Sequence, residues 1–452
     1  MKKDNRLFSS PQAMLVGGFA SVILLGAFVL WLPFSHHPGQ VNFLDALFTS
    51  TSAVCVTGLV VVDTGKAYTH FGQVVIMLLI QAGGLGVMTF AALTFQILRS
   101  RMSLQTTAVL HDSFFQRDIG HEFKRLFWRI LGMTFSIELV GAGLLSFVLI
   151  REKGLAAGLF SALFHSVSAF CNAGFSLYSD SLIGLRTHPI VTFTIMGLIV
   201  LGGLGYSVLL EFWDRFRRFR EDRNSGALRL LSLNTRVVLY TTAFLIVGGA
   251  ASLLLLGLTP GEHGWGTRIS AALFQSVTAR TAGFNTIHIG RLPVASLILL
   301  ILLMFVGGSP GSCAGGIKTT SFAVYAARIR SRLLGEQDVH ILGRRIPREI
   351  LRRTTLLISL SIVWNGAGVI LLMAMEAHHP GMGLPQIMFE QISAFGTVGL
   401  STGITSSLSA GARLWIIATM FMGRLGPLTL AMLIFKQKRT LVRYPVGRVM
   451  IG

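Results

Sequence analysis

Four stretches of this sequence share one short phrase: SAVCVTGL (Ser52–Leu59), SAFCNAGF (Ser168–Phe175), TARTAGF (Thr278–Phe284) and SAFGTVGL (Ser393–Leu400). Each phrase ends on a glycine beside a large apolar residue, and a phenylalanine stands nine or ten residues before that glycine. The glycines are Gly58, Gly174, Gly283 and Gly399, which lie 116, 109 and 116 residues apart. Self-similarity at a long period indicates a duplicated architecture. We therefore expect four like units around a common axis.

The composition is typical of a membrane protein. Of the 452 residues, 52% are hydrophobic and 13% are charged, whereas soluble proteins carry about 25% charged residues. Apolar runs of about 20 residues, enough to cross a bilayer as a helix, recur along the chain. The 50 glycines fit this class, because small residues let membrane helices approach closely. The sequence predicts an all-α integral membrane protein in contact with the lipid bilayer.

The uneven distribution of positive charge predicts an orientation in the membrane. The formal net charge is +20, and 29 of the 39 Lys and Arg residues lie at the two termini or in and beside three long loops (99–125, 213–234 and 328–353). The positive-inside rule makes these segments cytoplasmic. We expect a multi-pass protein of the plasma (inner) membrane with both termini in the cytoplasm. We expect no nucleic-acid partner, because no supporting aromatic pattern or motif accompanies the charge.

Each predicted repeat is a spanning helix, a half-length pore helix that ends in the phrase, and a second spanning helix. The repeats cover residues 12–98, 125–212, 235–328 and 354–435, followed by a cytoplasmic tail at 436–452. The predicted spanning helices are 12–32, 70–98, 126–150, 190–212, 235–258, 293–327, 354–374 and 412–435. The predicted pore helices are 43–56, 157–171, 268–280 and 384–395. This arrangement gives eight transmembrane helices around a central pore, in four pseudo-symmetric repeats.

The phrases are predicted to form the ion-binding part of that pore. A helix that stops inside a bilayer leaves unpaired carbonyls, which are tolerated only beside protein or a water-filled cavity. Carbonyls around an axis can replace the hydration shell of potassium, and glycine permits the left-handed backbone that turns them inward. Each helix dipole adds about −0.5 charge at the C-terminal end. The candidate filter residues are Val56, Thr57, Gly58, Asn172, Ala173, Gly174, Thr281, Ala282, Gly283, Thr397, Val398 and Gly399.

Several other functions are disfavoured. No phrase carries Asp or Glu beside its glycine, which argues against a carboxylate site for a divalent cation. Arg280, near the third phrase, either opposes a multivalent cation beside it or points away into the packing. We find no phosphate-binding glycine loop after a strand, no His pair at metal spacing and no supported nucleophile–base arrangement. The chain is therefore not expected to be an enzyme or to bind a cofactor of its own, apart from potassium as the transported ion.

A second motif recurs after each phrase: AGGLG (Ala82–Gly86), LGGLG (Leu201–Gly205), VGGSPG (Val306–Gly311) and MGRLG (Met422–Gly426). The third copy continues into GGSPGSCAGGIK (Gly307–Lys318). Such a segment disfavours a continuous helix, because each Gly costs about 1 kcal/mol and Pro about 3 kcal/mol against Ala. We predict a broken helix with a movable gate loop below the four glycines. The candidate gate residues are Gly307, Gly308, Ser309, Pro310, Gly311, Ser312, Gly315, Gly316, Lys318 and Arg424.

Arg424 stands in the fourth motif where the other copies have Gly84, Gly203 and Gly308. An intramembrane charge is costly and marks a functional site by default, although a snorkelling or salt-bridged structural arginine is an alternative. A cation about 4 Å away would be opposed by roughly 4 kcal/mol at an effective dielectric constant near 20. The guanidinium could also bond carbonyls of the gate loop.

Together these motifs resemble the Trk/Ktr/HKT potassium-uptake superfamily, and most of all the membrane subunit of bacterial Ktr systems. The resemblance rests on VTGL, NAGF, TAGF, TVGL, the glycine-rich loop and MGRLGPLTL, and it extends to the C-terminal RYPVGRV. It implies gated, channel-like potassium uptake with a filter at the four glycines, a gating loop at Gly307–Gly316 and a pore arginine at Arg424. It also implies a homodimer on a cytosolic ring of nucleotide-binding regulatory subunits, in which ATP or ADP binds to the partner.

The ion and the class of transport have alternatives. Plant members of the superfamily with serine at the first filter position favour sodium, so Gly58 argues for potassium. An ion-coupled symporter with inverted repeats is a second hypothesis, but basic loops on one side after every repeat indicate parallel repeats. A receptor or scaffold without transport is a third. Within the fourth phrase Gly396 and Gly403 compete with Gly399, which we choose by its spacing from Phe389. The third phrase is one residue shorter before Thr281.

Overall fold

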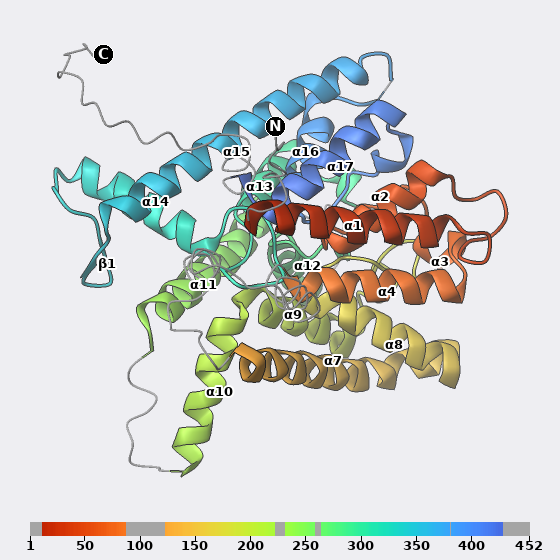
Figure 1. Ribbon diagram of the computed structural model, residues 1–452, viewed down its shortest axis with the longest axis horizontal. Helices are drawn as coiled ribbons and strands as arrows, with labels where there is room; N and C mark the ends of the chain where they lie inside the picture. Colours follow the sequence, from red (N-terminus) through yellow and green to blue (C-terminus); the bar gives the residue numbers. More distant parts are fainter. Residues whose placement is uncertain (1–10, 87–122, 222–230, 258–263, 380, 428–452) are drawn as a thin grey trace, which may run out of the picture.

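The protein is predominantly helical. A computed structural model describes residues 11–86, 123–221, 231–257, 264–379 and 381–427, and within these ranges the strands form only one two-stranded hairpin (Figure 1). The ends of the predicted helices 70–98 and 412–435, most of the loop 99–125 and the predicted tail 436–452 lie outside the described residues.

A long helix and then a shorter helix precede each phrase. The long helices are α1 (Pro11–Trp31), α7 (Phe123–Lys153), α11 (Leu233–Leu255) and α15 (Arg348–Met375). The shorter helices, which end at or within the phrases, are α2 (Phe43–Val54), α8 (Leu155–Phe170), α12 (Trp265–Thr278) and α16 (Leu384–Gly396). These four shorter helices match the predicted pore helices to within a few residues.

The helices after the phrases are less uniform. They are α4 (His70–Gly84), α9 (Pro189–Leu204) with α10 (Tyr206–Glu221), α13 (Val294–Phe305) with α14 (Thr319–Leu333), and α17 (Ala410–Leu425). Short elements fill the connections: α3 (Thr64–Ala67), η2 (Ile289–Arg291), η3 (Thr405–Ser407) and the antiparallel hairpin of β1 (His340–Ile341) and β2 (Arg344–Arg345). In Figure 1, α10 and the α14–hairpin segment extend away from the main body of helices.

Local polar contacts fix the start of the first short helix. Asn42 caps α2, since its side chain accepts from the Asp45 amide while the Asp45 carboxylate accepts from the Asn42 amide. This reciprocal capping satisfies amide donors that a helix start otherwise leaves unpaired. The Asp45 carboxylate also lies 2.8 Å from Arg413 Nη1 on α17. The same buried acid therefore helps to start α2 and ties it to α17, the last helix that the structure describes.

The apolar core closes the molecule into a circle. Phe48, Phe164, Phe274 and Phe389, the phenylalanines before the phrases, are all 0% exposed. One cluster joins α1, α2 and α4 to α8, α16 and α17; a second joins α7, α8 and α9 to α12; a third joins α11, α12 and α13 to α16. Each cluster thus joins short helices that belong to neighbouring phrases, so the first group of helices packs against the last as well as against the second.

Glycines allow the helices after the phrases to touch the ends of the short helices. A Cβ atom built on Gly83, Gly202 or Gly423 would lie 2.0, 1.8 or 2.0 Å from the carbonyl oxygen of Val54, Phe170 or Phe395, respectively. These are the first glycines of the second motif. Because the contact is with backbone, a side chain has no room there, and these glycines serve packing.

The prediction of one continuous helix over 190–212 was wrong. The chain divides there into α9 and α10, which are bent by 99°, and Gly205 between them has φ +90°. Gly205 is left-handed, and this conformation is incompatible with an α-helix. The apolar composition of residues 190–212 gives no sign of it. The helices α4 and α17 also end at this motif, at Gly84 and Leu425, and Gly86 and Gly426 have φ +75° and +83°. The last glycine of the motif therefore ends a helix.

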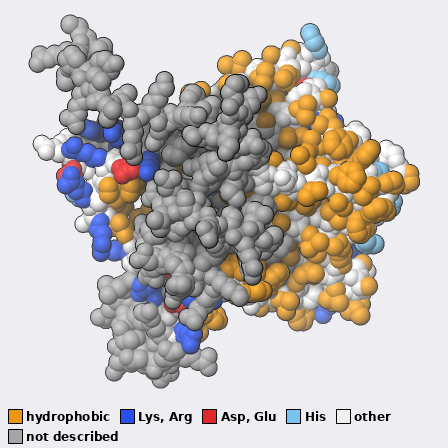
Figure 2. All heavy atoms as spheres, in the orientation of Figure 1, with side chains coloured by type: hydrophobic (Ala, Val, Ile, Leu, Met, Phe, Trp, Pro, Cys, Tyr) orange, Lys and Arg blue, Asp and Glu red, His pale blue; other side chains and the backbone are white. Residues whose placement is uncertain are grey.

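Helix length and composition agree with a membrane location. Among the described residues, three helices are long and apolar enough to cross a bilayer: Phe127–Lys153, Leu233–Leu255 and Arg348–Met375. The bent pair α9 and α10 would be a fourth if it is counted as one span. The total of eight spanning helices stays a prediction. Figure 2 shows apolar side chains over much of one end of the visible face and Lys and Arg gathered at the other end.

The close approach at Gly202 predicts an unequal response of two glycines on α9. Gly202→Ala should lower stability by about 1–3 kcal/mol, the usual cost of overpacking, because its Cβ would collide with the Phe170 carbonyl. Gly197→Ala is the control: nothing lies within 4 Å of its built Cβ, and alanine favours the helix by up to about 1 kcal/mol. Thermal denaturation in detergent measures both. Equal melting temperatures would contradict the packing role of Gly202.

Candidate ion pathway

The four phrase glycines form a closed ring. Each glycine lies against the backbone of the next phrase in chain order, and the last lies against the first. A Cβ built on them would approach the carbonyl oxygen of the residue before the next glycine: Gly58 to Ala173 at 2.4 Å, Gly174 to Ala282 at 2.7 Å, Gly283 to Val398 at 2.6 Å and Gly399 to Thr57 at 2.1 Å. The twelve candidate filter residues are therefore brought together around one centre.

Each phrase crosses this ring in the same unusual backbone conformation. The four glycines have φ between +68° and +90°. The residue two positions earlier is also left-handed: Val56 (φ 57°), Asn172 (58°), Thr281 (76°) and Thr397 (48°). A positive φ at a β-branched residue is an outlier, and such strain persists only where the surroundings enforce it. The sequence pattern indicated the glycines but not this second left-handed residue.

The matched conformations identify the ring residues of the third and fourth phrases. Thr281 and Gly283 occupy the same positions as Val56 and Gly58, so the shorter third phrase is in register from Thr281 onward. In the fourth phrase Gly399 is the ring residue. Gly396 instead ends α16, and Gly403 has open space around its built Cβ.

A hydroxyl at the start of each phrase ties its two ends together. Ser52 Oγ and Ser393 Oγ accept from the amides of Gly58 (3.0 Å) and Gly399 (3.2 Å). In the other two phrases, Ser168 Oγ donates to the Phe175 carbonyl (2.8 Å) and Thr278 Oγ1 donates to the Phe284 carbonyl (2.6 Å). Sequence reasoning missed this role, although the signal was present, since every phrase begins with Ser or Thr.

The ring glycines open on one shared cavity. Gly58, Gly174, Gly283 and Gly399 all line a cavity of about 730 Å³. Its walls are the segments that follow the phrases, and they include the side chains of Asp63, Asp180 and Arg291. All four phrases therefore border one vestibule.

Arg280 does not face the ring. Its side chain is buried, and Nη2 donates to Thr242 Oγ1 on α11 at 3.3 Å. Of the two alternatives, the structure favours an arginine that points away into the packing between α11 and α12.

The glycine-rich loop (residues 306–318) interrupts the helix, as predicted. The helix α13 ends at Phe305 and α14 begins at Thr319. The two ends of the loop are joined, because Val306 pairs with Ile317 and the Gly307 amide donates to the Ile317 carbonyl at 2.9 Å. The Thr319 amide also donates to the Gly308 carbonyl at 3.0 Å. The helix is therefore broken, as predicted, and the two ends of the intervening loop are hydrogen-bonded to each other.

The loop lies next to the ring. A Cβ on Gly315 would be 2.2 Å from Thr397 Oγ1, and one on Gly307 would be 3.2 Å from Thr281 Cγ2. The Lys318 ammonium, at the end of the loop, donates to the Ala314 carbonyl at 2.6 Å. Two of the candidate gate residues, Gly307 and Gly315, therefore pack against the third and fourth phrases.

Contacts with four other helices, α9, α10, α4 and α17, hold the loop in place. At the break between α9 and α10, the amides of Ser309 and Cys313 donate to the carbonyls of Gly203 (3.0 Å) and Gly202 (3.3 Å). The Tyr206 amide donates to the Gly311 carbonyl at 3.0 Å. From α4, the Gly84 carbonyl accepts from Cys313 Sγ at 3.1 Å. The contact with α17 is made by Arg424.

Arg424 bridges the loop and α4. Its Nη1 donates to the Cys313 carbonyl and its Nη2 donates to the Gly83 carbonyl. Within the part of the chain that the structure describes, Arg424 forms no ion pair. The bonding of a loop carbonyl, which sequence analysis raised, is what the structure shows.

Comparison with known proteins places the chain in a family. The family TrkH, described as cation transport protein, matches residues 8–440. The chain belongs to this family of cation transport proteins. Its members are transporters and not enzymes, in agreement with the sequence prediction.

Several relatives and one solved structure are similar over most of the chain. The chain is 38% identical to the Ktr system potassium uptake protein B of Bacillus subtilis (strain 168), with 98% of this chain and 97% of that protein covered. It is 36% identical to the protein of the same name from Vibrio alginolyticus (100% and 97%) and 35% identical to the potassium/sodium uptake protein NtpJ of Enterococcus hirae (100% and 99%). The crystal structure of the potassium transporter TrkH from Vibrio parahaemolyticus matches the fold with a TM-score of 0.69 at 19% identity, covering 96% of this chain and 86% of that one.

The hydroxyl ties predict a stability effect at the first phrase. Ser52→Ala should destabilise the protein by about 1–3 kcal/mol, because the buried Gly58 amide loses its acceptor. Ser136→Ala is the control: this hydroxyl bonds within its own exposed helix turn, and its loss should cost no more than about 0.5 kcal/mol. Thermal denaturation of the purified proteins gives the comparison. A melting temperature for Ser52→Ala equal to that of the control would show that the tie is dispensable.

Proposed function

We propose that this protein takes up potassium across the plasma membrane through a gated pore whose selectivity filter is the ring of four phrases. The observation that carries the proposal is the ring itself, in which four matched backbone segments lie around one centre and line one vestibule. Two close relatives are named as potassium uptake proteins. The chain belongs to a family of cation transport proteins, and a ring of backbone carbonyls is the feature of this structure that could bind the transported cation.

Backbone chemistry supports potassium as the ion. The twelve residues of the ring contain no carboxylate, so the carbonyl groups are the ligands, and carbonyl ligands suit a large monovalent cation. The short helices α2, α8, α12 and α16 all end at the ring. Their C-terminal dipole ends each contribute about −0.5 charge there. Cation stabilisation thus comes from dipoles, which allow an ion to leave again, rather than from fixed charges.

The four-repeat architecture is part of the proposal. We infer eight spanning helices in four parallel units around the pore, with cytoplasmic termini. One recurring contact supports it: Gly26, Gly141 and Gly249 of the long helices each lie against the serine hydroxyl of Ser50, Ser166 or Ser276 on the following short helix. In the fourth unit Gly368 meets Gln391 instead. The gathering of basic side chains at one end of the molecule supports the orientation.

The glycine-rich loop is proposed as the gate. It touches the ring on one side and α4, α9 and α17 on the others. With Arg424 and Lys318 it places two positive charges beside the pathway, which oppose a cation. Since α14 continues directly from the loop to the basic end of the molecule, displacement of α14 would move the loop.

A partner is expected to supply that displacement. We propose a homodimer on a cytosolic ring of regulatory subunits that bind ATP or ADP. The names of two relatives describe them as protein B of a Ktr system, which supports a further component. Uptake coupled to sodium or protons is the second candidate, and the name of the potassium/sodium uptake protein NtpJ favours testing sodium in particular.

Uptake into liposomes tests the filter. With the partner ring and ATP present, rubidium should enter in preference to sodium, and Gly58→Ser should lower the preference about tenfold or more. A loss of about 1.4 kcal/mol of ion stabilisation gives that factor, and the serine Cβ would displace the Ala173 carbonyl. Gly39→Ser is the matched control, since Gly39 also has a positive φ (+75°, against +90° at Gly58) but has nothing within 4 Å of its built Cβ. Equal uptake of the two ions by the unmodified protein would reject the filter, and unchanged preference in Gly58→Ser would reject its assignment to Gly58.

Substitution of Arg424 tests the gate. Arg424→Lys should raise basal rubidium flux without the partner, because one ammonium cannot replace a planar guanidinium that bonds two carbonyls on different elements. Arg424→Gln should raise it further, since the positive charge is also removed. Arg236→Gln, at an exposed position on α11, serves as the control and should leave the flux unchanged. Basal flux that stays the same or falls in both Arg424 variants would count against a gate held by this residue.

A further inference from the structure

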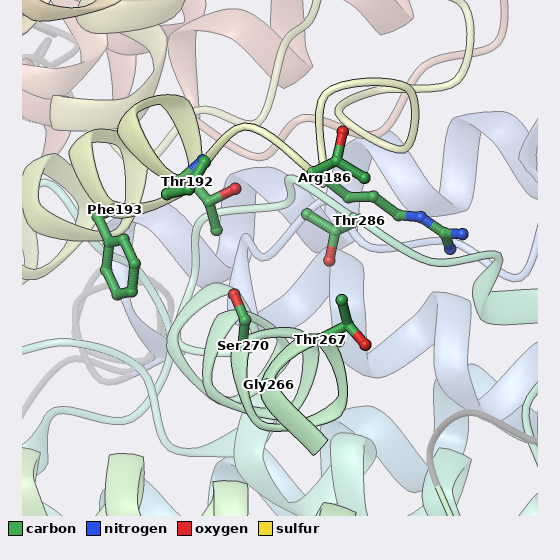
Figure 3. A pocket seen from close by; sticks show the side chains of 10 residues that line it. Arg186, Thr192, Phe193, Gly266, Thr267, Ser270 and Thr286 are labelled. Carbon is green, nitrogen blue, oxygen red and sulfur yellow. The ribbon is translucent and has the colours of Figure 1, made fainter. Parts of the chain in front are cut away.

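A second cavity lies away from the proposed pathway, between the starts of α9 and α12. Its volume is about 500 Å³, and its lining residues are Arg186, Thr187, Pro189, Thr192, Phe193, Gly266, Thr267, Ser270, Ala271 and Thr286. None of the ring glycines lines it. The side chains come from the segment before α9, from α9 itself, from the first turns of α12 and from the segment after the third phrase (Figure 3).

The electrostatic environment of this cavity favours an anion. Two helices begin at its edge, α9 with 16 residues and α12 with 14, and neither start is capped by a side-chain hydrogen bond. Helix starts carry uncompensated amide donors and about +0.5 charge, which makes them anion-binding positions. The described lining residues include one cation, Arg186, and no carboxylate.

A buried hydroxyl gives independent evidence for a ligand. Thr286 is 3% exposed and its Oγ1 has no hydrogen-bond partner in the described structure. Buried polar groups are almost always bonded, so an exception calls for a physical reason. Figure 3 shows the Thr286 hydroxyl directed across the cavity toward Ser270, with the Arg186 side chain along the rim. An acceptor group in the cavity would satisfy Thr286 and would face the arginine and both helix starts.

The surroundings of the cavity indicate a lipid rather than a soluble anion. Phe193, on the cavity wall, is 59% exposed, and Ile190, one turn earlier on α9, is 50% exposed. Trp265, at the start of α12, is 72% exposed, and tryptophan is enriched where a membrane protein meets the headgroup layer. The polar cavity thus opens beside an apolar surface that acyl chains can cover.

We propose that this cavity binds the phosphate group of an anionic phospholipid, with its acyl chains along the exposed apolar face of α9. Arg186 and the helix starts hold the phosphate, and Thr286 and Ser270 donate to its oxygens. A zwitterionic lipid fits less well, because the positive ends of two helices and Arg186 would also face its quaternary ammonium group. The site lies between the second and third groups of helices, so an occupied cavity would join α9 to α12.

Native mass spectrometry of the delipidated protein tests this site. The protein is incubated with phosphatidylglycerol or phosphatidylcholine of equal chain length, with and without millimolar inorganic phosphate. Retention of phosphatidylglycerol should fall about tenfold in Arg186→Gln, as expected for one lost charge-assisted bond. Retention of phosphatidylglycerol should also fall in Thr286→Val, which leaves Arg186 in place and replaces the threonine by a side chain of nearly the same shape. Arg151→Gln, exposed at the end of α7 and outside the cavity, should bind like the unmodified protein.

Four results would overturn the proposal. Three of them are unchanged retention in Arg186→Gln, an equal loss in Arg151→Gln, and equal binding of the two lipids. The fourth is displacement of the lipid by inorganic phosphate, which would assign the cavity to a soluble anion. Melting temperatures of the variants show whether each is folded, and Thr286→Val provides a second measurement if Arg186→Gln is not. Since the readout is bound lipid, the result does not depend on whether the pore selects potassium.

Discussion

The structure depends on the contact between each phrase glycine and the carbonyl of the next phrase. A Cβ at any of the four positions would lie within 3 Å of backbone, so the ring closes only if every position lacks a side chain. Each phrase provides the backbone carbonyl against which the glycine of the previous phrase packs. The four segments are therefore interdependent although they are distant in sequence. The strain of the left-handed residues before the glycines, of order 1–3 kcal/mol each, is held by this mutual contact and by the hydroxyl ties.

Below the ring, the interrupted helices satisfy one another's backbone groups. A helix end at membrane depth needs partners for its carbonyls. Those of Gly202 and Gly203, at the end of α9, accept from amides of the glycine-rich loop, and the Gly83 carbonyl of α4 accepts from Arg424. The breaks are therefore not independent, since the loop supplies donors for α9 and the arginine supplies donors for α4 and the loop. These shared hydrogen bonds explain why one chain contains both an interrupted third unit and a charged residue in the fourth.

The sequence predicted what depends on spacing and missed what depends on backbone conformation. The four short helices, the ring glycines and the broken third helix follow from a repeated phrase and from a segment too rich in glycine to remain helical. The bend at Gly205 was missed because an apolar run has the same composition whether it is straight or broken. The contact of Gly205 with the Pro310 carbonyl of the loop is a tertiary contact that the run itself does not indicate. The left-handed Val56 and Thr281 carry no local signal, since valine and threonine normally avoid that conformation.

The position of Arg424 limits how the loop can move. Its guanidinium bonds carbonyls on two separate elements, so displacement of the loop from α4 breaks at least one of these bonds. A hydrogen bond to a charged group contributes about 1.5–3 kcal/mol, and a two-state equilibrium changes from 1:99 to 99:1 with about 5.5 kcal/mol. Half of that difference, about 2.7 kcal/mol, holds one state at 99:1, so one such bond reaches this value only at the upper end of its range. The additional bonds between the loop and Gly202, Gly203 and Tyr206 add to the free energy that holds the loop in the position seen in the structure.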